Sequence, residues 1–229
     1  MEKLKNVKII NIIAILVLMV TVCVSSLSCS PGGISFPDPN LEEAVREAID
    51  KPAGSIVQSD LAELTTLDDV GLVEDLSGLE HCTNLRILYI VVSEIEDLSP
   101  LAGLTSLTRL TLEDCKITDI SALSGLYQLE YLNLDDNQIS DVSPLASLPS
   151  LKYLTIDNNE ITDVTPLSNL HNIENLYLHS NLIADIGPLV ENTGLSGGDY
   201  LTLQYNPLSD TSINTYIPQL EARGVDVGY

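Results

Sequence analysis

One apolar pattern recurs every 22 residues, and this periodicity constrains the fold more than any other feature of the chain. Successive segments begin at Leu85, Leu107, Leu129, Leu151 and Ile173, with an aliphatic residue again at their fourth and sixth positions. A single segment of this length cannot bury its own apolar side and must stack on its neighbours. The sequence therefore predicts a solenoid.

The first seven positions of each repeat alternate between apolar and polar residues, which predicts a short strand with one buried face. In the segment that starts at Leu129, Leu132 and Leu134 supply that face, and Ile139 and Leu145 close the core from the other side of the coil. Stacked coils place these strands in a parallel sheet with about 4.8 Å between neighbours. The predicted fold class is an α/β solenoid, a right-handed superhelix (horseshoe) with a concave parallel β-sheet and a helical cap at each end.

A polar residue, most often asparagine, follows each strand where the chain turns inward. A primary amide carries donors and acceptors together, so stacked asparagines can bind the backbone of adjacent turns. Ser93 and Cys115 take this place in the first two full coils and can form fewer hydrogen bonds. The predicted structural ladder consists of Cys115, Asn137, Asn159, Asn181 and Asn206.

Aspartate also recurs in every coil, just before the next turn. A short carboxylate at that point can accept backbone N–H bonds at the start of a helical turn, so we interpret these residues as structural. They are Asp97, Asp119, Asp141, Asp163, Asp185 and Asp210.

The two ends of the chain depart from the repeat and are assigned to caps. Asp38 and Pro39 predict a helix start, and residues 36–62 form the helical N-terminal cap. The repeats occupy residues 63–210, and residues 211–229 form a C-terminal cap whose apolar positions have helical spacing.

The pattern LxxLxLxxNxIxDIxPLxxL, the N-terminal FPDPNLEEAVREAI and the C-terminal NPLSDTSINTYIPQLEARGVDV resemble the leucine-rich repeat proteins of the bacterial internalin family. The resemblance spans most of the chain. It implies recognition of a protein or other cell-surface macromolecule as the usual activity. Family members often add an immunoglobulin-like domain and a wall-attachment signal after the repeats. Neither pattern follows the repeats here, so host-cell adhesion is not part of the expectation.

Residues 1–28 predict a secretory signal peptide. Lys3, Lys5 and Lys8 precede an apolar run over residues 9–24, which is short for a membrane-spanning helix. We expect an extracytoplasmic protein of a bacterial cell envelope, either secreted or anchored as a lipoprotein.

Cys29 is the candidate lipidation site, because it follows small residues as the acylated cysteine of bacterial lipoproteins does. Ser26 stands where such signals usually have leucine, and ordinary cleavage with release is the alternative. Residues 29–35 are then a short tether. Membrane association is expected only through this anchor.

The formal net charge is −23, which disfavours nucleic acid and anionic lipid as partners and favours basic or cation-bridged ones. Cys82 and Cys115 lie two coils apart, about 10 Å, which is beyond the roughly 7 Å that a disulfide allows between Cα atoms. We therefore predict two buried free thiols and expect a monomer.

Binding residues are expected at the strand positions that the core leaves free, the third, fifth and seventh of each repeat. Tyrosines recur there, and tyrosine is favoured in binding surfaces, although aromatic residues also simply suit strands. The predicted contact residues on the concave face are Tyr89, Arg109, Glu113, Tyr131, Asn133, Asp135, Tyr153, Asp157, Tyr177, His179 and Tyr200.

Three acidic residues of this set, Glu113, Asp135 and Asp157, fall on consecutive coils. They can face solvent as a charged strip, pair with a basic partner or share a calcium ion. An apolar group, Ile87 with Val91 and Val92, lies near the first coil and is either a contact area or covered by the cap.

Catalysis has little support in the sequence. The histidines have no metal-ligand spacing, and an open sheet lacks the enclosed pocket that acyl transfer by Asp157, His179 and Ser180 would need. We therefore predict no enzyme, cofactor or metal site. The expected function is an exported binding module that uses its concave face; the alternative is an acidic structural component of the envelope or matrix, with a divalent-cation requirement as one form of it.

Overall fold

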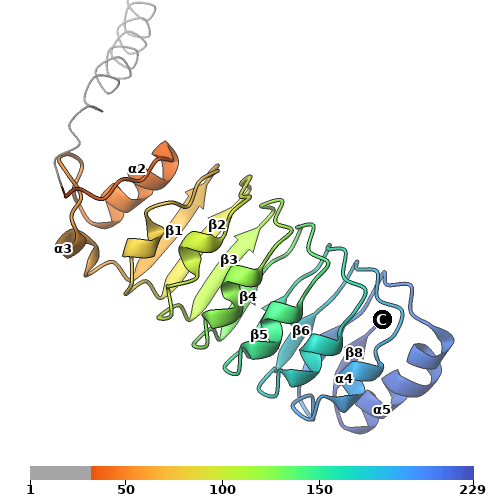
Figure 1. Cartoon of the computed structure of the whole chain (residues 1–229). Helices are drawn as coiled ribbons and strands as arrows, with labels where there is room; N and C mark the ends of the chain where they lie inside the picture. Colours follow the sequence, from red (N-terminus) through yellow and green to blue (C-terminus); the bar gives the residue numbers. More distant parts are fainter. Residues whose placement is uncertain (1–31) are drawn as a thin grey trace, which may run out of the picture. The chain divides into compact units, whose positions relative to one another are not determined.

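The computed structural model describes residues 32–229, of which Ile34–Tyr229 form one compact unit. Its strands follow one another in chain order in one parallel sheet along one side of the unit (Figure 1). They are β1 (Thr66–Gly71), β2 (Ile87–Val91), β3 (Arg109–Glu113), β4 (Tyr131–Asn133), β5 (Tyr153–Thr155), β6 (Asn175–Tyr177), β7 (Tyr200–Thr202) and β8 (Asp226–Gly228).

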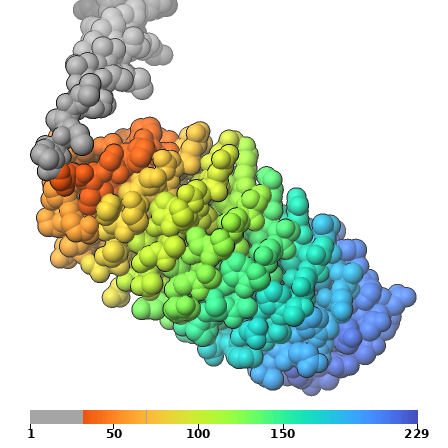
Figure 2. All heavy atoms as spheres, in the orientation of Figure 1, coloured from red at the N-terminus to blue at the C-terminus, as the bar shows by residue number. Residues whose placement is uncertain are grey.

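Short helical turns return the chain along the opposite side of each coil. They are the 3-10 turns η1 (Leu79–His81), η2 (Ser99–Leu101), η3 (Ser121–Gly125), η4 (Ser143–Ser147) and η5 (Thr165–Asn169), followed by the helix α4 (Gly187–Glu191). In space-filling view the coils lie against one another as consecutive bands (Figure 2). This arrangement confirms the predicted solenoid with a parallel sheet.

Aspartates begin these turns as expected. The Asp119 carboxylate accepts the main-chain N–H of Ser121 at 2.8 Å, and the corresponding bond is made by Asp97, Asp141, Asp163 and Asp185. Asp210 differs, because the N–H of Ser212 is bound by the Ser209 hydroxyl instead.

The core lies between the sheet and the turns. The residues at the fourth repeat position are in register from β3 to β7 and form a continuous, fully buried stack of Leu110, Leu132, Leu154, Leu176 and Leu201. Burial of one such side chain contributes roughly 1.5–3 kcal/mol to the free energy of unfolding. Because the register is identical, each leucine is buried by the coils on both sides of it.

The helix α2 (Pro39–Ala48) packs beside β1 and buries Leu41 and Val45. Asp38 begins it by accepting the N–H groups of Asn40 and Leu41, and its second carboxylate oxygen accepts the N–H of Glu74 in the first coil. One side chain thus joins the helix start to the solenoid. A short helix, α3 (Gln58–Leu61), follows before β1.

The folded unit starts before the predicted boundary at residue 36. The N–H of Ile34 donates to the carbonyl of Ile56 at 2.7 Å in an antiparallel bridge, so the last residues of the predicted tether belong to the fold. The predicted signal peptide and Cys29 lie outside the described residues. Between residues 32 and 229, no helix has the length and apolar character required to cross a membrane.

The C-terminal segment continues the sheet. A π-helical turn, η6 (Ser212–Tyr216), leads into α5 (Ile217–Ala222), and β8 then pairs in parallel with β7. The preceding coil contains an insertion that needs Gly194, because a Cβ there would lie 2.3 Å from the carbonyl oxygen of His171.

Candidate functional site on the strand face

Five side chains form a continuous row across the side of the sheet that faces away from the core. We call this side the strand face. Tyr131 and Tyr153 pair directly across β4 and β5, and their rings stack with centroids 4.9 Å apart. The row continues to Tyr177 at 5.2 Å and to Tyr200 at 5.5 Å, while the Arg109 guanidinium lies 5.5 Å from the Tyr131 centroid. We call Arg109, Tyr131, Tyr153, Tyr177 and Tyr200 the tyrosine row.

The row follows from the strand register. Tyr131 and Tyr153 occupy the third repeat position, whereas Tyr177 occupies the fifth and lies diagonally between Tyr153 and Tyr200. Diagonal neighbours on adjacent strands are within reach of aromatic side chains. One face of each coil thereby contributes to a single aromatic surface that no individual repeat could build.

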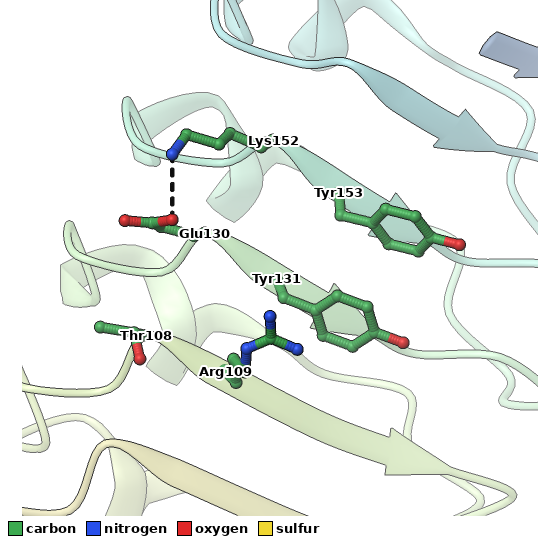
Figure 3. A pocket seen from close by; sticks show the side chains of 6 residues that line it. All are labelled: Thr108, Arg109, Glu130, Tyr131, Lys152 and Tyr153. Atoms are coloured by element: carbon green, nitrogen blue, oxygen red, sulfur yellow. Dashed lines mark hydrogen bonds and ion pairs between the residues drawn. The ribbon is translucent and has the colours of Figure 1, made fainter.

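Beside the row lies an open hollow of about 300 Å³ (Figure 3). Arg109, Tyr131 and Tyr153 line one part of it, and an exposed ion pair at 3.0 Å between Lys152 and Glu130 lines another. Aromatic, cationic and anionic groups are thus presented together, a combination suited to a protruding side chain of a partner.

Asn133 is not free, which corrects its prediction as an exposed contact residue, although Tyr89 and Tyr177 at the same fifth repeat position are at least partly exposed. The Asn133 side chain is only 8% exposed, and threonines at the same position on other strands are buried too. The Asn133 amide donates to Glu113 at 3.0 Å, and its Oδ1 accepts the N–H of Asp135 at 2.8 Å. Asn133 holds two neighbouring acids in place because both ends of its amide are engaged.

The acidic residues are likewise bound between coils. The Asp135 carboxylate accepts the Thr155 hydroxyl at 2.6 and 2.7 Å and the N–H of Asp157 at 2.6 Å. Asp157 accepts the N–H of His179 at 2.6 Å in the next coil. The ends of neighbouring strands are therefore linked along the solenoid by Glu113, Asp135 and Asp157. Within residues 32–229, no group of three or more His, Cys, Asp or Glu is placed to hold a metal ion.

Burial raises the pKa of Asp135 from its ordinary value of 3.8 to about 6, against the opposing effect of its hydrogen bonds with Thr155 and Asp157. Burial raises the pKa of Asp157 as well. Asp135 therefore takes up a proton in mildly acidic solution.

His179 and a residue absent from the sequence prediction, Tyr205, form a second aromatic contact. Their rings meet edge to face at 4.9 Å, and Tyr205 is 81% exposed. Sequence reasoning missed Tyr205 because it follows the strand at the eighth position, which was not counted as part of the face. The Asp157 carboxylate accepts the main-chain N–H of His179, and the His179 ring contacts Tyr205. Tyr89, the remaining predicted residue, lies on β2 and is partly exposed.

The asparagines bridge neighbouring coils. Oδ1 of Asn137 accepts the N–H groups of Cys115 and Ile117 at 3.1 and 2.9 Å, and Nδ2 donates to the carbonyl of Leu112 at 2.7 Å. The same bridge to the preceding coil is made by Asn159, Asn181 and Asn206.

Cys115 has only weak thiol contacts at the equivalent place, with the carbonyls of Glu113 and Ile90. Cys115 and Cys82 are both free and buried, which confirms the prediction for these two residues. Burial raises the pKa of each thiol to about 12, so both stay protonated and unreactive at neutral pH.

Stacked 22-residue coils, a parallel sheet and asparagine bridges together define a leucine-rich repeat protein. The family model described as leucine rich repeats (2 copies) matches residues 83–125, 105–147, 127–169 and 149–191. No curated protein matches the chain in sequence.

Two solved internalins of Listeria monocytogenes resemble the chain with 33% sequence identity. The match to inlF has a TM-score of 0.66 and covers 89% of this chain and 66% of inlF. The match to inlC2 has a TM-score of 0.62 and covers 87% of this chain and 98% of inlC2. The chain belongs to the internalin-like family of bacterial leucine-rich repeat proteins.

A leucine-rich repeat protein of Leptospira interrogans shares the fold, with a TM-score of 0.53 and 18% identity over 75% of this chain and 51% of that one. The fold is therefore common to proteins whose sequences, and hence whose exposed residues, differ widely.

Proposed function

We propose that the protein binds a protein or other cell-surface macromolecule through its strand face, with the tyrosine row as the main contact. The internalin-like fold supports a protein-interaction module of this kind. The stacked row carries the proposal, because partly exposed aromatic side chains that are already fixed lose little conformational freedom on binding.

The chemistry of the row favours a particular kind of contact. Tyr131 and Tyr153 are stacked, whereas Tyr177 is tilted against Tyr153 and meets Tyr200 edge to face, so a partner meets ring edges, hydroxyl groups and part of the ring faces. A hydrogen bond with Tyr153 raises the pKa of Tyr177 to about 12, so part of the hydrogen-bonding capacity of these hydroxyls is used within the row. The acidic surroundings and the net charge of −23 favour a basic partner surface.

Affinity capture from envelope and medium extracts tests the proposal, with residues 34–229 as bait. A Tyr131/Tyr153/Tyr177→Ser variant should lose the captured partner and keep the circular dichroism spectrum of the parent. Tyr127→Ser is the matched control, because Tyr127 is 58% exposed but follows η3 on the opposite side of the coil. Equal capture by parent and triple variant would contradict a role for the row.

The same protein acts, in this proposal, outside the cytoplasm. The charged and apolar pattern of residues 1–28 supports export, and Cys29 supports a lipid anchor at the mature N-terminus. Detergent phase partitioning of the protein from its native host tests the anchor. The parent should enter the detergent phase and a Cys29→Ser variant should not; recovery of both in the aqueous phase would instead establish release.

A further inference from the structure

The residue at the eighth repeat position, in the turn after the strand, has a positive φ in every coil. Values range from 52° at Val92 and Ser180 to 58° at Tyr205. L-residues rarely adopt this left-handed conformation, and asparagine and aspartate tolerate it best. Asp114, Asp136 and Asn158 accordingly occupy it in the middle of the solenoid.

The first two coils break this rule with Leu72 and Val92. A β-branched residue such as valine is a true outlier there. These side chains are also exposed, Leu72 by 70% and Val92 by 57%, so the core gains nothing from them. Two unfavourable choices at equivalent backbone positions, where the next three coils use aspartate or asparagine, indicate that the exposed apolar side chains themselves are needed.

Leu72 and Val92 are neighbours, because the residues just before them, Gly71 and Val91, pair across β1 and β2. The next two coils present exposed carboxylates at the same position, Asp114 and Asp136. The edge of the sheet therefore changes from apolar to acidic over four coils. Three spacings of about 4.8 Å give a length of roughly 14 Å, which an extended peptide covers in about five residues.

We propose that this rim, formed by Leu72, Val92, Asp114 and Asp136, docks an extended protein segment in which alternate residues face the rim: two apolar residues, and a basic residue two positions before or after them. The apolar residues contact Leu72 and Val92, and the basic side chain lies between the two aspartates. Charge complementarity fixes the register of the segment along the rim. The rim is separate from the tyrosine row, and its function does not depend on the one proposed above.

Fluorescence anisotropy with labelled synthetic peptides tests the rim directly on the purified protein. The probe is a ten-residue peptide with the central sequence Leu-Ser-Leu-Ser-Lys, whose first, third and fifth side chains face one way, used in this order and reversed, because both chain directions satisfy the proposal. Two control peptides replace either the leucines by serine or the lysine by glutamate. At least one order of the probe should bind saturably, and both controls should bind about tenfold more weakly or worse.

The decisive variant is Leu72→Asn/Val92→Asn, because asparagine tolerates the left-handed backbone and should preserve or raise the melting temperature. It should weaken binding of the probe about tenfold or more. Tyr205→Asn, which makes the same change at the same backbone position at the other end of the solenoid, should bind the probe as the parent does.

A second variant, Asp114→Asn/Asp136→Asn, separates the two halves of the rim. It should weaken binding of the lysine probe, with the loss greatest at low salt, since screening reduces attraction between exposed charges. Failure of both probe orders to bind the parent, undiminished binding by the Leu72→Asn/Val92→Asn variant, or an equal loss with Tyr205→Asn would overturn the proposal.

Discussion

Two regions of the solenoid share one leucine skeleton but differ in the hydrogen bonds that hold their turns. The central region consists of the coils that begin at Leu129 and Leu151, and the N-terminal region consists of the two coils before residue 107. In the former, Asn137 and Asn159 bridge coils through several hydrogen bonds. In the latter, Ser93 makes one bond to the N–H of Val73 and one to the carbonyl of Val91. Apolar residues also replace aspartate and asparagine in the left-handed position.

This difference indicates that the apolar stack alone is sufficient to build a coil. The polar residues of the turn determine how rigidly that coil is held against its neighbours. The firmly held coils carry Tyr131 and Tyr153, where a preorganised binding surface benefits from rigidity. The first coils combine weaker turns with Leu72 and Val92, exposed residues that the scaffold itself does not require.

The largest effect is expected for Asn159→Ala. This change removes the amide bonds to Leu134 and Ile156 and leaves the N–H of Ile139 without its acceptor in a buried turn. We expect a loss of about 3 kcal/mol or more in the free energy of unfolding, measured by urea denaturation. A loss below about 1 kcal/mol would show that the ladder does not fix the central coils.

Ser93→Ala makes the corresponding change in the N-terminal region and should cost only about 1 kcal/mol. A single hydroxyl, which binds Val73 and Val91, is lost. The same denaturation experiment compares the two variants. Equal losses for Ser93→Ala and Asn159→Ala would remove the distinction between the two regions.

Asn158→Val places a β-branched residue in the left-handed conformation at φ 53°. Because valine is disfavoured in this conformation, the melting temperature should fall, and the free energy of unfolding should decrease by about 1 kcal/mol. Val92→Asn should produce a rise of similar size. Both changes can be followed by calorimetry, and two shifts of the same sign would refute the account of the eighth position.

The smallest effect concerns pH. Because the pKa of Asp135 is raised from 3.8 to about 6 in the folded protein, its protonated form stabilises the fold below pH 3.8 and this contribution is lost as pH rises through 6. Relative to Asp135→Asn, the parent should therefore become less stable between pH 4 and pH 7. Because Asp135 is partly exposed, solvent screening limits this change in the free energy of unfolding to about 1 kcal/mol or less. A difference between the two proteins that does not vary with pH would contradict the raised pKa.

The sequence predicted the coils, the core and the bridging asparagines because these depend on a period that is visible in one dimension. Leu132 and Asn137, for example, are placed by repeat position alone. It also predicted which strand positions face outward. Whether an outward residue is free depends on its neighbours in other coils, and Asn133 is buried because Glu113 and Asp135 engage its amide.

Backbone conformation was the other part that the sequence did not reveal. Leu72, Val92 and Tyr205 give no local signal for positive φ, since the signal residues for that conformation are glycine, asparagine and aspartate. Their conformation is imposed by the coils on either side. The aromatic contact of Tyr205 with His179 was missed because the eighth repeat position was not counted as part of the strand face.

Hydroxyl-radical footprinting of tyrosines in the complex with the captured partner tests the central claim most directly. Tyr131, Tyr153, Tyr177 and Tyr200 should become protected from oxidation together, whereas Tyr127, which is exposed on the opposite side of its coil, should react as in the free protein. Protection of Tyr127 with an unchanged row would contradict binding through the strand face.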